Sequence, residues 1–244
     1  MSKYGHLTGN WNESLINVVG GEEAGNRLIR GDLLVVEKSN PLAFNVLPPL
    51  NNWLTYKVLG REDLFDQAMT GQMPTPESNL WDLLVLPEVT INMVAQAFNK
   101  LGVVTSFRYG DNLTANLNPE FEVPDFSGPH LLRFQRSLVG ETTDKSANAR
   151  WELRQKGAEG YNDPRICDVA LLALSVFLVT GGKLLNLEKW TRTRSRFRDG
   201  GVVFFDAFPG KVYVDSYSPV YVDPGARVRP AVSFPILASG AQPK

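Results

Sequence analysis

The pattern of hydrophobic and polar positions predicts two helices of different character. Residues 164–180 are apolar at nearly every position, which indicates a helix that is buried on all sides. Pro164 suits its first turn, and the glycine pair at 181–182 suits its end. Residues 89–101 instead carry apolar side chains three and four positions apart, and Gly102 follows as a stop. This second helix is expected to bury one face only.

A third helix and several strands are predicted in the first half of the chain. Residues 61–70 begin with acidic side chains and are followed by glycine, which is typical of a short helix. Residues 33–36 form a short apolar run, and residues 53–59 are rich in aromatic and β-branched side chains. Both segments are predicted to be strands, as are residues 103–109.

The last part of the chain reads as β structure. Four short β-prone runs are separated by proline–glycine and serine–proline turns, at 202–205, 212–214, 220–222 and 228–234. We expect them to form a twisted meander that ends the domain. The fold class expected is therefore α+β, with two or three helices packed on a mostly antiparallel sheet.

Two polar stretches divide the chain into three regions. Residues 111–129 are rich in asparagine, proline, glycine and acidic side chains, and residues 141–163 are polar almost throughout. We expect an N-terminal α+β region over 1–110, a loop-rich or mobile segment over 111–163, and a helix with a meander over 164–244. The first and third regions can form one domain.

Composition and charge exclude several classes of protein. The chain has 244 residues, 43% of them hydrophobic, which is enough for a core without disulfides or metals. A net charge of -1 gives no overall field that would collect nucleic acid or an anionic membrane. The longest apolar stretch, 169–179, is shorter than the roughly 20 residues that span a bilayer. No secretion signal opens the sequence, so we expect a cytoplasmic or virion protein without membrane contact.

Residues that could carry catalysis are scarce. The single cysteine, Cys167, excludes an intrachain disulfide, and His6 and His130 are the only imidazoles. No nucleophile turn and no phosphate-binding glycine loop occurs. Cys167 is expected to be a plain buried thiol, although a place in the first turn of a helix could lower its pKa. We therefore expect no catalytic residue and no cofactor, and we favour a protein that is not an enzyme.

The clearest local feature is a run of alternating arginines. Within TRTRSRFR they fall at every second position, namely at Arg192, Arg194, Arg196 and Arg198. On a strand they would share one face and form a basic ladder that could bind phosphate, carboxylate or nucleic acid. Alternatively, they belong to a solvated edge strand, where arginines discourage pairing with other chains.

Three aspartates of the C-terminal region are weak candidates for a metal site. Asp206, Asp215 and Asp223, with Glu188 or Asp199, could together hold a divalent cation. Aspartate is also common in turns for its own hydrogen bonding, and we favour that interpretation. No metal is expected.

The C-terminal residues resemble a module of many uncharacterised bacterial and phage proteins. The resemblance lies in WTRTRS, GGVV, PGKVYV and GARVRPAVSF, about 50 residues in all. That module is similar to the closing meander of the C-type-lectin-like fold, which formylglycine-generating enzymes also use. It implies structural roles for Trp190, Arg229 and Pro230. The sugar-binding E-P-N, Q-P-D and W-N-D motifs and the additional cysteines of the enzymes are missing, so neither function is implied.

A second resemblance concerns GGVVFFDAFP and VDSYSPVY, which are similar to a stretch of the RNA-binding backbone subunits of type III CRISPR effector complexes. The glycine-rich P-G-S-S-x-K-G segment of those subunits is absent. The arginine run would fit this interpretation.

These observations favour a binding or structural assembly protein of phage or mobile-element origin, with protein partners or self-assembly. Aromatic residues and arginine, which the predicted strands carry, are enriched in protein interfaces. One alternative is an RNA-binding subunit that uses the arginines at 192–198. The second alternative is a lectin-like domain that binds carbohydrate.

Overall fold

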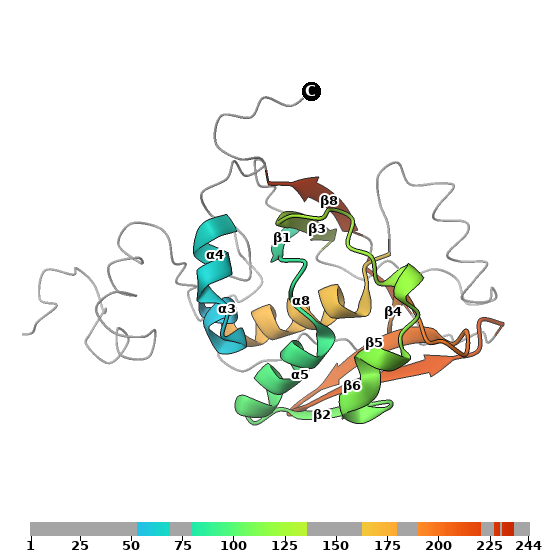
Figure 1. The fold of residues 1–244 in the computed structure, drawn as a ribbon. Coiled ribbons are helices and arrows are strands. Elements are labelled where there is room, and N and C mark those ends of the chain that lie inside the picture. Colours follow the sequence, from blue (N-terminus) through green and yellow to red (C-terminus); the bar gives the residue numbers. More distant parts are fainter. Residues whose placement is uncertain are drawn as a thin grey trace, which may run out of the picture.

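The computed structural model describes residues 53–68, 80–135, 163–179, 190–220, 227–229 and 231–236. These residues form an α+β fold, as the sequence predicts (Figure 1). The helices are α3 (Trp53–Leu59), α4 (Glu62–Ala68), α5 (Ile91–Lys100), α6 (Leu113–Asn116) and α8 (Ile166–Val179), with short 3-10 turns η1 (Gly110–Asn112) and η2 (Pro119–Phe121). The strands are β1 (Leu80–Val85), β2 (Val104–Phe107), β3 (His130–Gln135), β4 (Thr191–Arg196), β5 (Val202–Phe208), β6 (Lys211–Tyr217), β7 (Arg227–Val228) and β8 (Ala231–Pro235).

The strands form two sheets with α8 between them. One sheet has the order β1-β3-β8, and the other has the order β2-β6-β5-β4-β7. In Figure 1 the first sheet lies above α8 and the second lies below it, while α3 and α5 pack beside the helix. The side chains of α8 are buried from Ile166 through Val176. The nearly uniform apolar character of this segment therefore follows from having neighbours on every side.

Helix α5 packs one face against α8 and exposes the other. Its N-cap is Thr90, whose side chain accepts a hydrogen bond from the amide of Met93, 3.3 Å away. Val94 and Phe98 are buried on the face toward the core. Gly102, which follows the helix, has a φ of 77°, a conformation that glycine adopts without strain. The predicted helix and its stop are confirmed.

The five-stranded sheet is built around a tight hairpin between β5 and β6. Phe208 faces Lys211 across the turn, and the turn residues are Pro209 and Gly210. Gly210 has a φ of 75°, which the third position of a type II turn requires. On one side β6 pairs with β2, in parallel, and on the other side β5 pairs with β4. β4 also pairs with β7, so it is an inner strand.

The prediction of a strand at residues 53–59 is wrong, because Trp53–Leu59 is helix α3. Thr55, Tyr56 and Leu59 are buried, and these positions lie on one side of a helix. The Tyr56 hydroxyl donates to the carbonyl of Leu84 on β1, 2.6 Å away. The packing of this helical face outweighs the β preference of the aromatic and branched residues.

The prediction of a C-terminal meander is wrong in its topology. β5 and β6 form a hairpin as expected, but β8 leaves that sheet and pairs with β3 in the other one. The run predicted at 220–222 begins in a turn, since Val220 is a turn residue that is 79% exposed. β1 and β3 were not predicted. β1 lies in no predicted element, and β3 lies within the segment 111–163 that was expected to be loop-rich or mobile. β3 pairs with β1 on one side and with β8 on the other.

Parts of all three expected regions join one hydrophobic core. Trp81 and Phe98 from the first region, Leu117 and Phe134 from the second, and Phe205 from the third belong to the same cluster. Several predictions lie outside the described residues, namely the strand at 33–36, the glycine pair at 181–182 and nearly all of the polar stretch 141–163. Within the described part of the chain, no helix is long and apolar enough to cross a membrane.

Candidate binding surface

The two faces of the five-stranded sheet differ in what they contact. Residues of β5 that point toward α8, such as Val203 and Phe205, join the main core. The opposite side is called here the outer face. Because partner residues in a ladder share a face, the outer face carries matched rows across β2, β6 and β5. The first row is Val104, Lys211, Phe208; the second is Ser106, Tyr213, Asp206; the third includes Asp215 and Phe204.

Exposure changes along this face. At the turn end Val104 is 57% exposed and Phe208 is 47% exposed. Further along, Phe204 is buried, with the ring of Tyr217 5.1 Å away between centroids. The ring of Trp190 lies 6.0 Å from Tyr217 and completes this small cluster. The outer face is therefore closed over β4 and the adjoining part of β5, and open at the hairpin end.

The open end carries an aromatic pair with a cation. The rings of Phe208 and Tyr213 meet edge to face at 5.4 Å. The ammonium group of Lys211 lies 4.3 Å from the centre of the Tyr213 ring. Aromatic edges and cation–π contacts of this kind hold side chains in place while leaving apolar area in contact with solvent. Val104, Phe208, Lys211 and Tyr213 are called here the hairpin patch.

Arg108, which follows β2, is held by two carboxylates at the border of the patch. Its guanidinium lies 3.3 Å from a carboxylate oxygen of Asp215 and 3.8 Å from one of Asp199. It also lies over the rings of Tyr109 and Phe197, 5.4 and 5.8 Å from their centres. A hydrogen bond to Tyr109 and the bond to Asp215 raise the Arg108 pKa. This positive charge is thus balanced within the chain.

The aspartates proposed from the sequence as metal ligands have different surroundings. Asp206 and Asp215 lie on the outer face, Asp223 and Glu188 lie outside the described residues, and Asp199 faces Arg108. Burial raises the pKa of Asp206 to about 6, although its carboxylate accepts a hydrogen bond from the Ala207 amide. Among the residues that the structure describes, no three histidine, cysteine or acidic side chains are grouped so that they could hold a metal ion.

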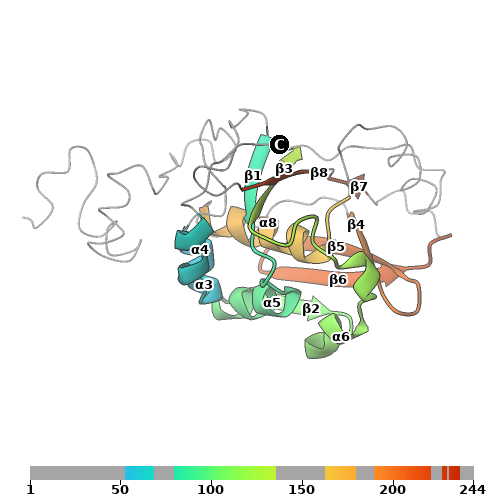
Figure 2. The ribbon, with the colours of Figure 1, turned by 45° about the horizontal axis from the view of Figure 1, so that its top comes forward.

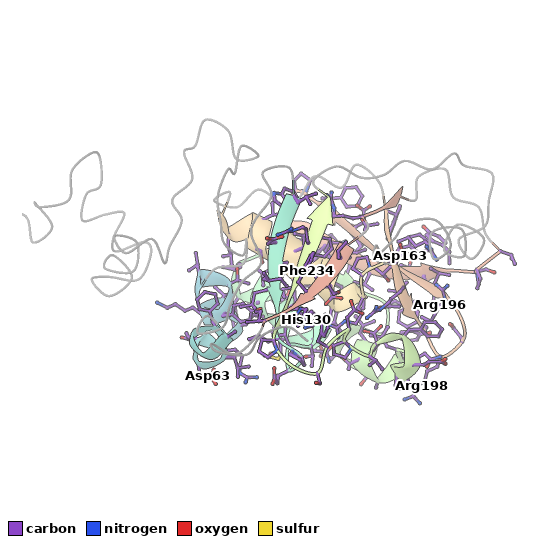
Figure 3. All side chains as sticks on the ribbon, turned by 90° about the horizontal axis from the view of Figure 1, so that it is seen from above. Asp63, His130, Asp163, Arg196, Arg198 and Phe234 are labelled. Carbon is purple, nitrogen blue, oxygen red and sulfur yellow. The ribbon has the colours of Figure 1, made fainter. Side chains whose placement is uncertain are left out.

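The four arginines of the predicted ladder do not share one exposed face. Arg192 is buried and its guanidinium lies 2.5 Å from a carboxylate oxygen of Asp163. Arg194 is bound to Asp125 at 2.6 Å, and Arg196 is buried over the ring of Phe121. Arg198 is exposed and lies beyond the strand, at the rim of the described core in Figure 3.

The structure contradicts both interpretations of the arginine run. The register between β4 and β5 shifts between Arg192 and Arg196, so the strand is irregular where a regular ladder was expected. β4 is also an inner strand, so the alternative interpretation as a solvated edge strand is wrong as well. The acidic partners Asp125 and Asp163 come from segments that read as polar loops, and nothing in their spacing revealed the pairing.

A buried group of charges surrounds the N-terminal end of α8. Arg165 and Asp168 form a two-pronged ion pair with a shortest distance of 2.7 Å. Arg165 also donates to the carbonyl of Glu122, and the Ser195 hydroxyl accepts a bond from the Ile166 amide at 2.9 Å. Burial raises the pKa of the Glu122 side chain to about 7, against the hydrogen bond from Ser195 and the charge of Arg165. The group fastens the helix to β4 and to the loop before β3.

The remaining residues singled out in the sequence are built into the core. Cys167 is buried, its thiol donates to the carbonyl of Val89, and burial raises its pKa to about 12. His130 is buried on β3, and burial lowers its pKa. Arg229 is buried over the ring of Trp81 at 5.3 Å, and burial lowers its pKa to about 10. His6 and Pro230 lie outside the described residues.

Comparison with known protein families, with curated proteins and with solved structures finds no match to this chain.

Proposed function

We propose that this chain is a protein-binding module of a larger assembly and that the hairpin patch is its contact surface. The observation that carries the proposal is the exposed ring of Phe208, which lies in one row with Lys211 and the exposed Val104 on the outer face, while the same face is closed further along. Fixed aromatic side chains on a rigid sheet lose little conformational entropy when a partner covers them.

The composition of the patch suits a protein partner. Aromatic residues are enriched in the centre of protein interfaces, and a few such side chains carry most of the binding energy. The ring of Tyr213 is already held by Phe208 and Lys211, so it is ordered before a partner arrives. The patch therefore combines exposed apolar side chains with one cation, Lys211, that lies between them.

The charges near the patch favour a protein over nucleic acid. Arg108 faces the carboxylates of Asp199 and Asp215, so that the border of the patch has no surplus of positive charge. Binding to phosphates needs such a surplus, because it depends on neutralising the nucleic-acid backbone. Binding through the arginine run would require the ion pairs of Arg192 and Arg194 to open.

The proposal is tested on protein isolated from its own host by size-exclusion chromatography with light scattering. We expect a mass above the 27.1 kDa of one chain and an absorbance at 260 nm that shows no nucleic acid. Phe208→Ser is expected to weaken the complex by about tenfold or more, as for an interface hot spot. Val220→Ser is the matched control, because Val220 is an exposed aliphatic residue after the opposite end of β6.

Two outcomes would contradict the proposal. A complex that Phe208→Ser leaves intact would show that the patch is not the contact surface. Nucleic acid that co-purifies and dissociates at high salt would favour the RNA-binding alternative.

A further inference from the structure

Strand β2 forms one edge of the five-stranded sheet, and only the side of β2 that faces β6 takes part in the hydrogen bonds of the sheet. β2 pairs with β6, and within the described part of the chain no strand lies beyond it. The amide of Val104 donates to the carbonyl of Gly210, and the amide of Arg108 donates to that of Val214. Because amides of a strand point alternately to its two sides, those of Thr105 and Phe107 point away from β6. Figure 2 shows β2 at the margin of this sheet.

The edge lacks the features that prevent pairing with another strand. Natural edge strands are blocked by lysine, proline, inward-pointing charges or a bulge. Val104–Phe107 reads VTSF, which contains no charge and no proline, and its register with β6 is regular. The side chains of this stretch are small or apolar. An added strand would therefore meet no charged side chain, proline or bulge along these four residues.

We propose that β2 pairs antiparallel with β2 of a second copy of this chain, about a two-fold axis at Ser106. This arrangement opposes Thr105 of one copy to Phe107 of the other. The outward amides and carbonyl groups of both residues then find hydrogen-bond partners in the second copy. An axis at Thr105 would instead oppose Phe107 to Val103, whose amide already donates to the carbonyl of Phe98. The open groups therefore select the axis at Ser106.

The side chains of the outer face are compatible with this pairing. The axis at Ser106 opposes Val104, which is 57% exposed, to Arg108 of the second copy. The guanidinium of Arg108 is neutralised by Asp199 and Asp215 of its own chain, so its aliphatic stem can cover the valine. No two like charges face each other across the axis between residues 104 and 108. A second copy of this chain therefore fits the edge of β2 better than a strand of another protein that would be recognised by its charges.

The pairing shares only Val104 with the hairpin patch and does not depend on the proposed function. It is formed by the backbone of one edge, whereas the patch is formed by side chains of the outer face. Recombinant chain without any other protein is sufficient to test it, and host-isolated complexes are not needed.

The first test is a cross-link at the axis. Directly opposed residues of a non-hydrogen-bonded antiparallel pair have Cα atoms about 4.5 Å apart, which is within the range of a disulfide. Ser106→Cys is expected to give a covalent dimer on mild oxidation, because the native Cys167 is buried and cannot compete. Thr114→Cys, at an exposed position on α6, is the control. Cross-linking of Ser106→Cys no faster than the control would overturn the proposal.

The second test removes an outward donor without disturbing the fold. Proline at position 105 lacks the amide hydrogen that points to the open edge, whereas the bonds from β2 to β6 come from neighbouring residues. Thr105→Pro is expected to raise the dimer dissociation constant about tenfold or more, since two hydrogen bonds per dimer are lost. Thr105→Val is the matched control. It loses the hydroxyl bond to Asn99 but keeps the amide.

The outcomes separate this pairing from the proposed function. A dimer in light scattering that Thr105→Pro dissociates and Thr105→Val retains supports the pairing. A wild-type chain that is monomeric at every concentration, or a dimer unaffected by Thr105→Pro, overturns it. If the pairing fails while Phe208→Ser still dissolves the host complex, the hairpin patch stands alone. If Phe208→Ser is silent while Thr105→Pro dissociates the dimer, the pairing stands alone.

Discussion

The carboxylate of Asp163 and the guanidinium of Arg192 form an ion pair in which both side chains are 1% exposed. The two residues are 29 positions apart, on opposite sides of the α8 segment. Their contact ties the start of the segment that leads into α8 to the first half of β4. A charge pair without contact to water is costly to form and still more costly to break from one side.

Removal of one partner of this pair is expected to destabilise the fold strongly. Arg192→Met removes the guanidinium that pairs with the buried Asp163 carboxylate, and loss of one member of a buried ion pair typically costs about 3–5 kcal/mol. The double variant Asp163→Leu with Arg192→Met removes both charges and is expected to recover most of that loss. Urea denaturation measures the difference, and Arg198→Met, at an exposed position, is expected to leave the midpoint unchanged. Equal losses of stability in Arg192→Met and Arg198→Met would show that the ion pair does not stabilise the fold.

The stability of the fold is expected to fall as the pH rises from about 4.5 to about 7. Burial raises the Glu122 pKa to about 7, from a value of 4.5 in the unfolded chain, so the folded state binds the extra proton in this window. The stabilisation is fully present below pH 4.5 and is lost above pH 7. The shift corresponds to at most about 3 kcal/mol.

Glu122→Gln isolates this effect when unfolding is measured as a function of pH. The variant is expected to flatten the slope between pH 4.5 and 7 and to be more stable than the wild type above pH 7. Burial also raises the pKa of Asp206 to about 6, so this residue lowers the stability with rising pH in the same way. Asp206→Asn is expected to remove that contribution. His130 acts in the opposite direction, because its lowered pKa favours the folded state above pH 6.5 and this gain is lost on acidification. A Glu122→Gln curve parallel to that of the wild type would refute the assignment.

Substitution of Gly210 is expected to weaken the hairpin between β5 and β6. Its φ of 75° costs a residue with a side chain about 1–2 kcal/mol. No atom lies within 4 Å of a Cβ built at this position, so the cost comes from the backbone alone. Gly210→Asn is expected to lose less than Gly210→Ala, since asparagine tolerates this conformation. Thermal unfolding compares the two, and the reverse order would contradict the turn geometry.

The thiol of Cys167 is expected to be unreactive in the folded protein. Burial raises its pKa to about 12, so almost no thiolate is present at neutral pH. The position of Cys167 in the first turn of α8 therefore does not make the thiol a nucleophile. A thiol reagent at neutral pH is expected to label it only at the rate of unfolding. Asp111→Cys, at an exposed position, provides a rapidly labelled comparison once Cys167 is replaced by serine. Fast labelling of the native chain would show that α8 opens readily.

The sequence predicted elements whose pattern is local. The long apolar run over α8, the amphipathic pattern of α5 and the proline–glycine turn between β5 and β6 each depend on neighbouring residues only. Because helices and tight turns are stabilised by contacts over a few positions, their signals survive in a single sequence. The α+β class followed from them.

The candidate surface was only partly visible in the sequence. Aromatic residues on predicted strands were recognised, but the rows that join Val104, Lys211 and Phe208 depend on the parallel pairing of β2 with β6. That pairing connects residues more than a hundred positions apart. The arginine run was visible at once, yet the acidic partners that form ion pairs with Arg192 and Arg194 lie in distant loops.

Local pattern and composition were sufficient to predict the buried helix and the hairpin and to exclude an intrachain disulfide. Contacts between distant segments decided instead that residues 53–59 form a helix, that β8 joins β3, and that Arg192 and Arg196 are buried. The physical reason is the same in each case. A segment whose local preferences are weak or mixed adopts the conformation that buries its apolar face and pairs its charges, and the partners that allow this come from elsewhere in the chain.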